Sequence, residues 1–153
     1  MTQGDLIWQL RSFQLALQSA LDEALREIGL TAAQLSALEA LKHSPGESSA
    51  ELARSCGVTP QTMNGIVQIL ETNGLLVREP HRVHGRILRV YLSNAGESKL
   101  EAGRKVVGEI EERMVATMSE GEVESLQRFV SVCEGSLSAL ARRNGRGWSR
   151  RTG

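Results

Sequence analysis

The sequence holds few cysteines and few aromatic residues. Of its 153 residues, two are cysteines and five are aromatic. Cys56 and Cys133 have no metal-binding spacing and are too few for a disulfide framework, which excludes zinc-finger and disulfide-stapled scaffolds. A chain of this length can bury a sizeable core without such staples, so we expect a globular protein with no metal and no cofactor.

Long apolar runs are also missing. Hydrophobic residues make up 41% of the chain but occur in runs of only a few residues, which excludes a transmembrane helix. The first residues lack the basic-then-apolar order of a secretory signal. We therefore expect a soluble cytoplasmic protein that does not contact a membrane.

Positive charge is unevenly distributed, although the formal net charge is zero. Residues 78–105 hold seven Lys or Arg against three Glu, and residues 142–153 hold five Arg and no acid. Localised basic patches govern contact with nucleic acid more than the total charge does. The pattern permits a DNA-binding surface, although a run of charge is more often a solvated face.

Apolar spacing and capping patterns predict the first helices. Apolar residues recur at three- and four-residue steps over 6–28, which predicts a long amphipathic helix that ends at Gly29. Thr31 with Gln34 forms a capping box at the start of a second helix, over 32–43.

Two short helices follow. Ser48 with Glu51 is a second capping box, and Gly57 closes the helix that it begins. Thr59, followed by proline, suits the start of the next helix, over 60–73. Two short helices joined by a tight glycine turn are typical of a helix-turn-helix.

A hairpin and two long helices complete the pattern. Residues 75–77 and 88–92 read as strands on either side of a polar turn, and together they predict a wing. Apolar stripes then predict helices over 94–117 and 120–141. The last helix has the three-four alternation of a coiled-coil seam. That seam consists of Val123, Leu126, Val130, Cys133, Leu137 and Leu140.

These elements predict a mainly α fold with a small β-hairpin wing, a winged helix-turn-helix with long N- and C-terminal dimerisation helices. One domain is expected over 1–141. It comprises a DNA-binding lobe over 31–92 and a helical dimerisation frame over 5–28 and 94–141. Residues 142–153 are expected to form a disordered, basic Gly/Arg-rich tail.

Four short segments stand in a characteristic order. They are Leu-Thr-x-x-Gln-x-x-x-Leu at 30–38, Glu-Leu-Ala-Arg-Ser-Cys-Gly-Val-Thr at 51–59, Leu-Glu-x-x-Gly-Leu at 70–75 and Leu-Ser-x-x-Gly at 92–96. On these segments the chain resembles the multiple-antibiotic-resistance repressor (MarR) family over residues 5 to about 141. The Asp-x-Arg motif usual in the wing of that family is altered, because Arg86 keeps the arginine position while His84 replaces the acid.

The resemblance implies a triangular homodimer in which the first, fifth and sixth helices of two subunits interlock. It also implies binding to a palindromic operator in double-stranded DNA and, for many members, release by a small aromatic or phenolic effector. We therefore expect a transcriptional repressor of this type.

The recognition helix is expected to read bases through uncharged side chains. Residues 59–73 contain no Lys or Arg, so attraction to phosphate must come from the wing and from backbone N–H groups at capped helix starts. Asn and Gln can pair with adenine, and the Thr methyl can touch thymine. The predicted DNA-contacting residues are Ser48, Ser49, Thr59, Gln61, Thr62, Asn64, Gly65, Gln68, Arg82 and Arg86. Two further wing arginines, Arg78 and Arg89, can instead pair with Glu79 or Glu71.

Other residues have two interpretations each. Trp8, Phe13 and His43 can line an effector pocket, but as readily they are ordinary core or interface residues. Cys56 and Cys133 are expected to be buried as small hydrophobic side chains. His81 and His84 lack a third partner for a metal.

The sequence bears on three other functions. An enzyme is disfavoured because no nucleophile–base pair and no phosphate-binding glycine loop is present. A winged helix that binds protein is the stronger rival, because the fold is also used for assembly. An apolar exposed face on the recognition helix would favour it, whereas the polar face found here, beside a cationic wing, favours DNA. A redox-sensing regulator that acts through Cys56 is the remaining alternative.

Overall fold

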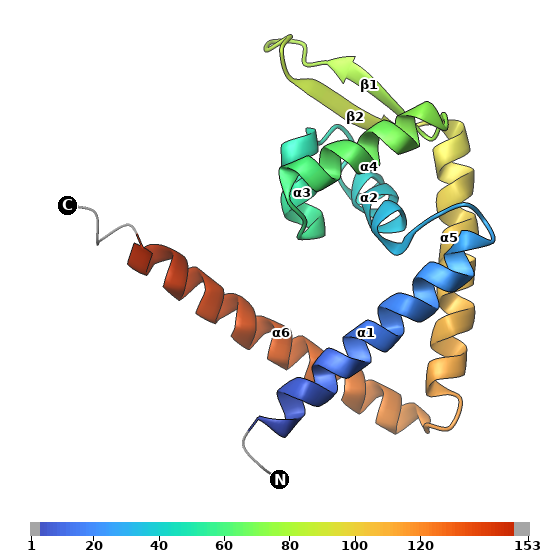
Figure 1. Ribbon diagram of the computed structural model, residues 1–153, viewed down its shortest axis with the longest axis vertical. Helices are drawn as coiled ribbons and strands as arrows, with labels where there is room; N and C mark the ends of the chain where they lie inside the picture. Colours follow the sequence, from blue (N-terminus) through green and yellow to red (C-terminus); the bar gives the residue numbers. More distant parts are fainter. Residues whose placement is uncertain (1–3, 149–153) are drawn as a thin grey trace. The chain divides into compact units, whose positions relative to one another are not determined.

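The computed structural model describes the backbone of residues 4–148 and the side chains of residues 4–140. Six helices and two strands follow one another over this part of the chain (Figure 1). In order they are α1 (Asp5–Arg26), α2 (Ala32–His43), α3 (Ser49–Cys56), α4 (Pro60–Thr72), β1 (Leu76–Pro80), β2 (Leu88–Leu92), α5 (Asn94–Val115) and α6 (Glu120–Trp148). The prediction of a mainly α fold with one β-hairpin is confirmed. The chain divides into two compact units, one ending at Glu111 and one beginning at Glu112.

The capping residues begin the helices as predicted. The Thr31 hydroxyl accepts a hydrogen bond from the Gln34 N–H at 3.2 Å, and the Gln34 side chain accepts one from the Thr31 N–H at 3.0 Å. Ser48 and Glu51 form the same reciprocal box at α3. These caps pair backbone donors that a helix start otherwise leaves unsatisfied, so they define where each helix begins.

A glycine makes the turn of the helix-turn-helix. Gly57 follows α3 with φ 67°, a left-handed conformation in which its N–H bonds back to the end of that helix. Thr59 then caps α4, where its hydroxyl accepts a hydrogen bond from the Thr62 N–H at 3.1 Å. Other residues rarely adopt this backbone conformation, so Gly57 allows the short connection between α3 and α4.

The core of the first unit lies beneath α4 and the hairpin. The face of α4 that carries Met63, Val67 and Leu70 is fully buried. It packs with buried side chains of α2 and α3, and with Leu76 and Val90 of the hairpin. Burial of this stripe fixes which face of α4 remains exposed to solvent.

The hairpin is joined to the helices by backbone hydrogen bonds. Strands β1 and β2 are antiparallel, from the pair Leu76 and Leu92 to the pair Pro80 and Leu88. The connection between α2 and α3 also pairs with β2, because Gly46 N donates to Val90 O and Val90 N donates to Glu47 O, both at 3.0 Å. The base of the wing is therefore held to the helix-turn-helix.

Two glycines let α5 approach the rest of its unit closely. A Cβ on Gly96 would collide with the carbonyl oxygen of Leu75, and a Cβ on Gly103 would collide with the side chain of Leu35. Both glycines are buried. They share one face of α5, since they are seven residues apart.

Apolar side chains remain exposed on two helices of the single chain. On α1 they include Trp8 and Phe13, which are 72% and 48% exposed. On α6 every side chain from residue 126 to residue 140 is exposed, including the predicted seam residues Val130 and Leu137. Within residues 4–148, no helix is long and apolar enough to cross a membrane.

Two expectations for the last helix differ from the structure. Cys133 is exposed rather than buried, as are its neighbours on α6 from residue 126 to residue 140. The backbone of α6 also continues to Trp148, past Arg142, where we expected the disordered tail to begin. Arginine favours helix, which is consistent with this continuation. The end of the tail, residues 149–153, lies outside the described residues.

Candidate DNA interface and ligand pocket

The solvent face of α4 carries the predicted base-reading residues. Gln61, Asn64, Gly65 and Gln68 are all exposed, at positions i, i+3, i+4 and i+7 of the helix. This spacing places them in one stripe, opposite the buried stripe of Met63. The structure therefore brings four of the predicted residues together on one uncharged polar surface.

The start of α4 presents two linked hydroxyl groups. Thr59 and Thr62 are both exposed, and the Thr59 hydroxyl donates to the Thr62 hydroxyl at 2.8 Å. The Thr59 oxygen is also the cap of the helix. These groups lie at the positive end of the helix dipole, where a phosphate oxygen would be favoured.

At the start of α3, the predicted DNA-contacting serines are half-buried, and one of them is hydrogen-bonded to a carboxylate of the same helix. Ser48 and Ser49 are half-buried, and the Ser48 hydroxyl donates to the Glu51 carboxylate at 2.9 Å. Hydrogen bonds from the Ser48 backbone N–H and then its side chain lower the pKa of Glu51, so this carboxylate stays charged. A negative group already present at this helix start opposes the approach of a phosphate.

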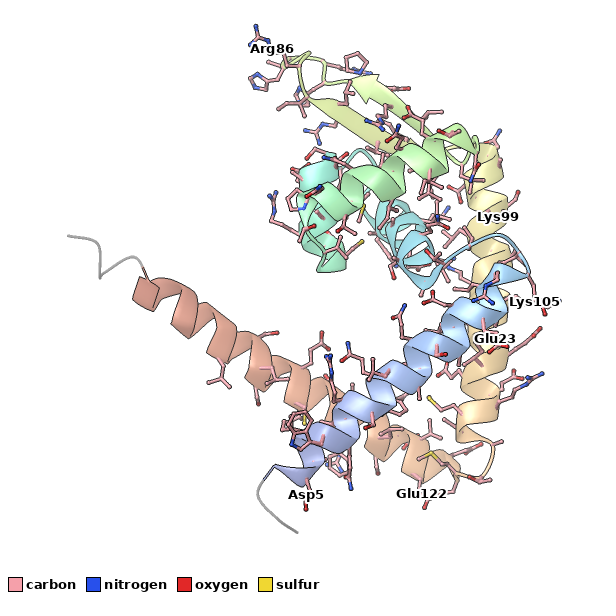
Figure 2. The ribbon with its side chains drawn as sticks, viewed as in Figure 1. Asp5, Glu23, Arg86, Lys99, Lys105 and Glu122 are labelled. Carbon is pink, nitrogen blue, oxygen red and sulfur yellow. The ribbon has the colours of Figure 1, made fainter. Side chains whose placement is uncertain are left out.

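The turn of the wing carries two exposed arginine side chains. Arg82 and Arg86 are exposed in the turn between β1 and β2. Figure 2 shows Arg86 at the far end of the hairpin, with its side chain pointing away from the strands. A cation held at a hairpin tip can enter a narrow minor groove, where negative potential is concentrated.

The other two wing arginines are held by the fold. Arg78 forms the predicted ion pair with Glu71 of α4, with its Nε 2.9 Å from a carboxylate oxygen. Arg89 lies opposite Glu79 in the hairpin, but its guanidinium donates to the Gly46 carbonyl at 2.7 Å. These contacts hold the wing against α4 and the loop before α3, so we assign both arginines a structural role rather than a DNA contact.

A separate pocket opens on the first unit among α1, α2, the end of α3 and α5. It has a volume of about 740 Å³ and a largely apolar wall that includes Leu21, Leu25, Leu35 and Val107. Pockets that take up small organic molecules have this size and apolar character. Of the three residues named for an effector pocket, His43 lines this one. Trp8 and Phe13 do not line it and lie exposed nearer the start of α1.

A charged cluster lies in the wall of this pocket. Arg104 of α5 donates to both carboxylate oxygens of Glu39 on α2, at 3.0 and 2.7 Å. His43 Nε2 lies 3.2 Å from the same carboxylate. The Arg104 hydrogen bonds lower the pKa of Glu39, and Glu39 in turn raises the pKa of Arg104, so both groups are charged at neutral pH.

Sequence reasoning missed Arg104 and Glu39. They are 65 positions apart, and neither belongs to a recognisable motif. The only local signal is the four-residue spacing of Glu39 and His43, which places both on one side of α2.

Three further residues bear on the redox and metal-binding alternatives. Cys56 lines the pocket, and burial raises the pKa of its thiol, which disfavours the reactive thiolate. The rings of His81 and His84 stack with their centroids 5.4 Å apart. Among the described residues, no group of three or more side chains is arranged to hold a metal ion.

Comparison with known proteins agrees with this architecture. Residues 28–87 match the MarR family. The HTH-type transcriptional repressor Rv2887 of Mycobacterium tuberculosis is 33% identical over 114 residues, which span 74% of this chain and 82% of the relative. The chain therefore belongs to the MarR family of DNA-binding transcription regulators, and its fold is that family's winged helix-turn-helix.

Two solved structures are similar over most of the chain. A probable transcriptional regulator from Pseudomonas aeruginosa is 29% identical, with a TM-score of 0.75 over 84% of this chain and 96% of its own. The Mycobacterium tuberculosis MarR family protein Rv2887, solved in complex with salicylic acid, is 30% identical. Its TM-score is 0.69 over 87% of this chain and 96% of its own.

Proposed function

We propose that the protein is a homodimeric repressor that reads a palindromic operator and is released from it by a small aromatic acid. The observation that carries the proposal is the pairing of an uncharged polar face on α4 with an exposed arginine at the wing tip. Neutral side chains can read base edges in the major groove, while the wing cation supplies attraction to the backbone and the minor groove.

The residues divide into two groups by chemistry. Gln61, Asn64 and Gln68 offer amides that suit adenine, and Thr62 offers a methyl and a hydroxyl. Gly65 allows the backbone of α4 to approach the bases closely. Arg82 and Arg86 contact the DNA from the wing, and the start of α4 at Thr59 faces a phosphate.

Dimerisation is supported by the apolar surface that one chain leaves uncovered. Leu10 and Phe13 on α1, and Val130 and Leu137 on α6, are each between 46% and 62% exposed. Contiguous apolar stripes of this kind mark association surfaces. A two-fold dimer carries two copies of α4, so its preferred DNA site has two half-sites about 10 base pairs apart.

The pocket that contains Arg104 is the proposed effector site. Rv2887 was solved with salicylic acid, an aromatic carboxylic acid. In this chain the apolar wall suits the ring, and Arg104 is the cation that can receive the carboxylate if Glu39 moves aside. Release follows if the ligand binds the DNA-incompetent arrangement of the dimer more tightly than the competent one.

Selection from a random duplex library tests the DNA-binding part. The recovered sequences are expected to contain an inverted repeat, and salicylate is expected to weaken binding to the selected duplex. Recovery of sequences with no common motif would contradict operator recognition. Salicylate that binds without changing DNA affinity would contradict release by that compound.

A further inference from the structure

The turn at the tip of the wing is organised by one histidine ring. The backbone N–H groups of Val83 and His84 both donate to Nδ1 of His81, at 3.1 and 3.0 Å. The turn is closed by two backbone bonds at 2.8 Å, from His81 N to Ile87 O and from Ile87 N to His84 O. Arg86 sits inside this closed loop, directly before Ile87.

The chemistry of imidazole limits which form of His81 fits this turn. A ring nitrogen that accepts hydrogen bonds carries no proton, so the ring must be neutral with its proton on Nε2. The imidazolium ion has a donor at both nitrogens and no acceptor. Protonation of His81 would place an N–H at Nδ1 against two backbone N–H groups and abolish both bonds.

The surrounding charges also oppose a proton on His81. The ring of His84 is stacked on that of His81, and Arg82 and Arg86 stand in the same turn. The strands that lead into the turn carry Glu79 and Arg89 opposite each other, and their opposite charges cancel. The turn is therefore cationic before His81 takes up a proton.

We propose that His81 is a positioning residue for DNA binding, whose neutral ring holds the wing turn that presents Arg86. Protonation of this ring in acid then loosens the turn, because Nδ1 can no longer accept the two backbone hydrogen bonds. Stability of the turn is present at higher pH, where the ring is neutral, and is lost as the pH falls. The positive charge that protonation adds would by itself strengthen attraction to DNA in acid. Loosening of the turn weakens DNA binding in acid, so the two effects have opposite signs.

NMR of the free protein tests the turn without any DNA. The ring nitrogens and the amides of Val83 and His84 are followed between about pH 8 and pH 5.5. At the higher pH we expect His81 to carry its proton on Nε2. As the pH is lowered, the Val83 amide resonance should shift together with the resonances of the His81 ring, both in the wild type and in His84→Asn. It should not shift in His81→Asn, whose side-chain oxygen accepts at every pH. A proton on Nδ1 of His81 at the higher pH, or an unchanged pH response of Val83 in His81→Asn, would overturn the proposal.

A DNA-binding measurement tests the consequence and rests on the proposed function. The probe is the duplex selected from a random library at about pH 8. Wild-type binding should weaken about three- to tenfold on acidification, the equivalent of one lost hydrogen bond of ordinary strength. His81→Asn should lack this loss and His81→Ala should bind weakly at both pH values. Equal pH responses of wild type and His81→Asn would overturn the proposal. If no duplex is bound at either pH, the proposed function fails, while the NMR result still decides the role of His81.

Discussion

Arg104 of α5 donates two hydrogen bonds, of 3.0 and 2.7 Å, to the carboxylate of Glu39 on α2. Both residues line an apolar pocket. The cation of the proposed effector site is thus already occupied by an acid of the same chain. An aromatic acid can use Arg104 only by replacing Glu39, so Glu39 acts as an internal competitor. Ligand affinity should therefore respond in opposite directions to changes at the two residues.

Substitutions at this pair test the pocket. Arg104→Ala should weaken salicylate binding about tenfold, because a charge-assisted hydrogen bond to the carboxylate is lost. Glu39→Gln should strengthen it, because the amide competes less well for Arg104. Calorimetric titration with salicylate measures both. Lys105→Ala is the matched control, since Lys105 neighbours Arg104 but does not line this pocket. Equal affinities for wild type, Arg104→Ala and Glu39→Gln would remove this pocket as the salicylate site.

The close approach of α5 to its unit is tested by glycine substitution. Gly96→Ala should lower the free energy of unfolding by about 1–3 kcal/mol, because the new methyl group meets the backbone carbonyl of Leu75. Gly108→Ala is the matched control on the same helix, where an added Cβ meets nothing within 4 Å. It should leave stability unchanged or raise it by up to about 1 kcal/mol. Urea unfolding of both variants measures the difference, and equal stabilities would show that α5 can shift to accommodate the methyl group.

Local signals made most of the fold predictable. Thr31, Ser48 and Thr59 mark helix starts through bonds to residues three positions away, so both partners lie within one short stretch of sequence. The helical spacing of Met63, Val67 and Leu70 likewise marks the face of α4 that is buried. The extension of α6 to Trp148 was not predicted, because the glycines of that segment favour disorder while its arginines favour helix.

A salt titration of DNA binding should distinguish Arg86 from Arg89 of the wing. Arg86→Ala should weaken binding to the selected duplex and reduce the magnitude of the salt slope by about one unit, since one contact to the DNA backbone or groove is lost. Arg89 is the control, because its guanidinium is held by the Gly46 carbonyl. Arg89→Ala should leave the salt slope near the wild-type value while lowering the stability of the protein. A slope that changes more for Arg89→Ala than for Arg86→Ala would reverse the two assignments.

The dimer interface is tested by the same substitution, valine to glutamate, at two positions of α6. Val130 and Val132 are both exposed in the single chain, at 55% and 63%. They are two residues apart and so point to different sides of the helix, and only Val130 belongs to the predicted seam. Val130→Glu should give a monomer or an aggregate that does not bind DNA, whereas Val132→Glu should remain dimeric. Sedimentation velocity distinguishes these outcomes, and a dimeric Val130→Glu would exclude the seam as the interface.

The parts of the site that sequence could not supply depend on contacts between distant residues. Nothing near Arg104 in the sequence identifies Glu39 as its partner, and nothing near Arg89 identifies Gly46. Trp8 and Phe13 do not line the pocket, whereas Leu21 and Leu25 of the same helix do, and the sequence does not say which part of α1 faces a cavity. By contrast, the exposed face of α4 followed directly from the helical period.

Hydroxyl-radical footprinting on the selected duplex tests the central claim most directly, that two copies of α4 read a symmetric site. The wild type should protect two equivalent stretches about 10 base pairs apart, related by the two-fold axis of the duplex. Asn64→Ala and Gln61→Ala should each cost about 1–3 kcal/mol of binding on this duplex and little on a random one, with both stretches affected alike. A single asymmetric protected stretch, or equal losses on selected and random DNA, would contradict recognition by a symmetric dimer through α4.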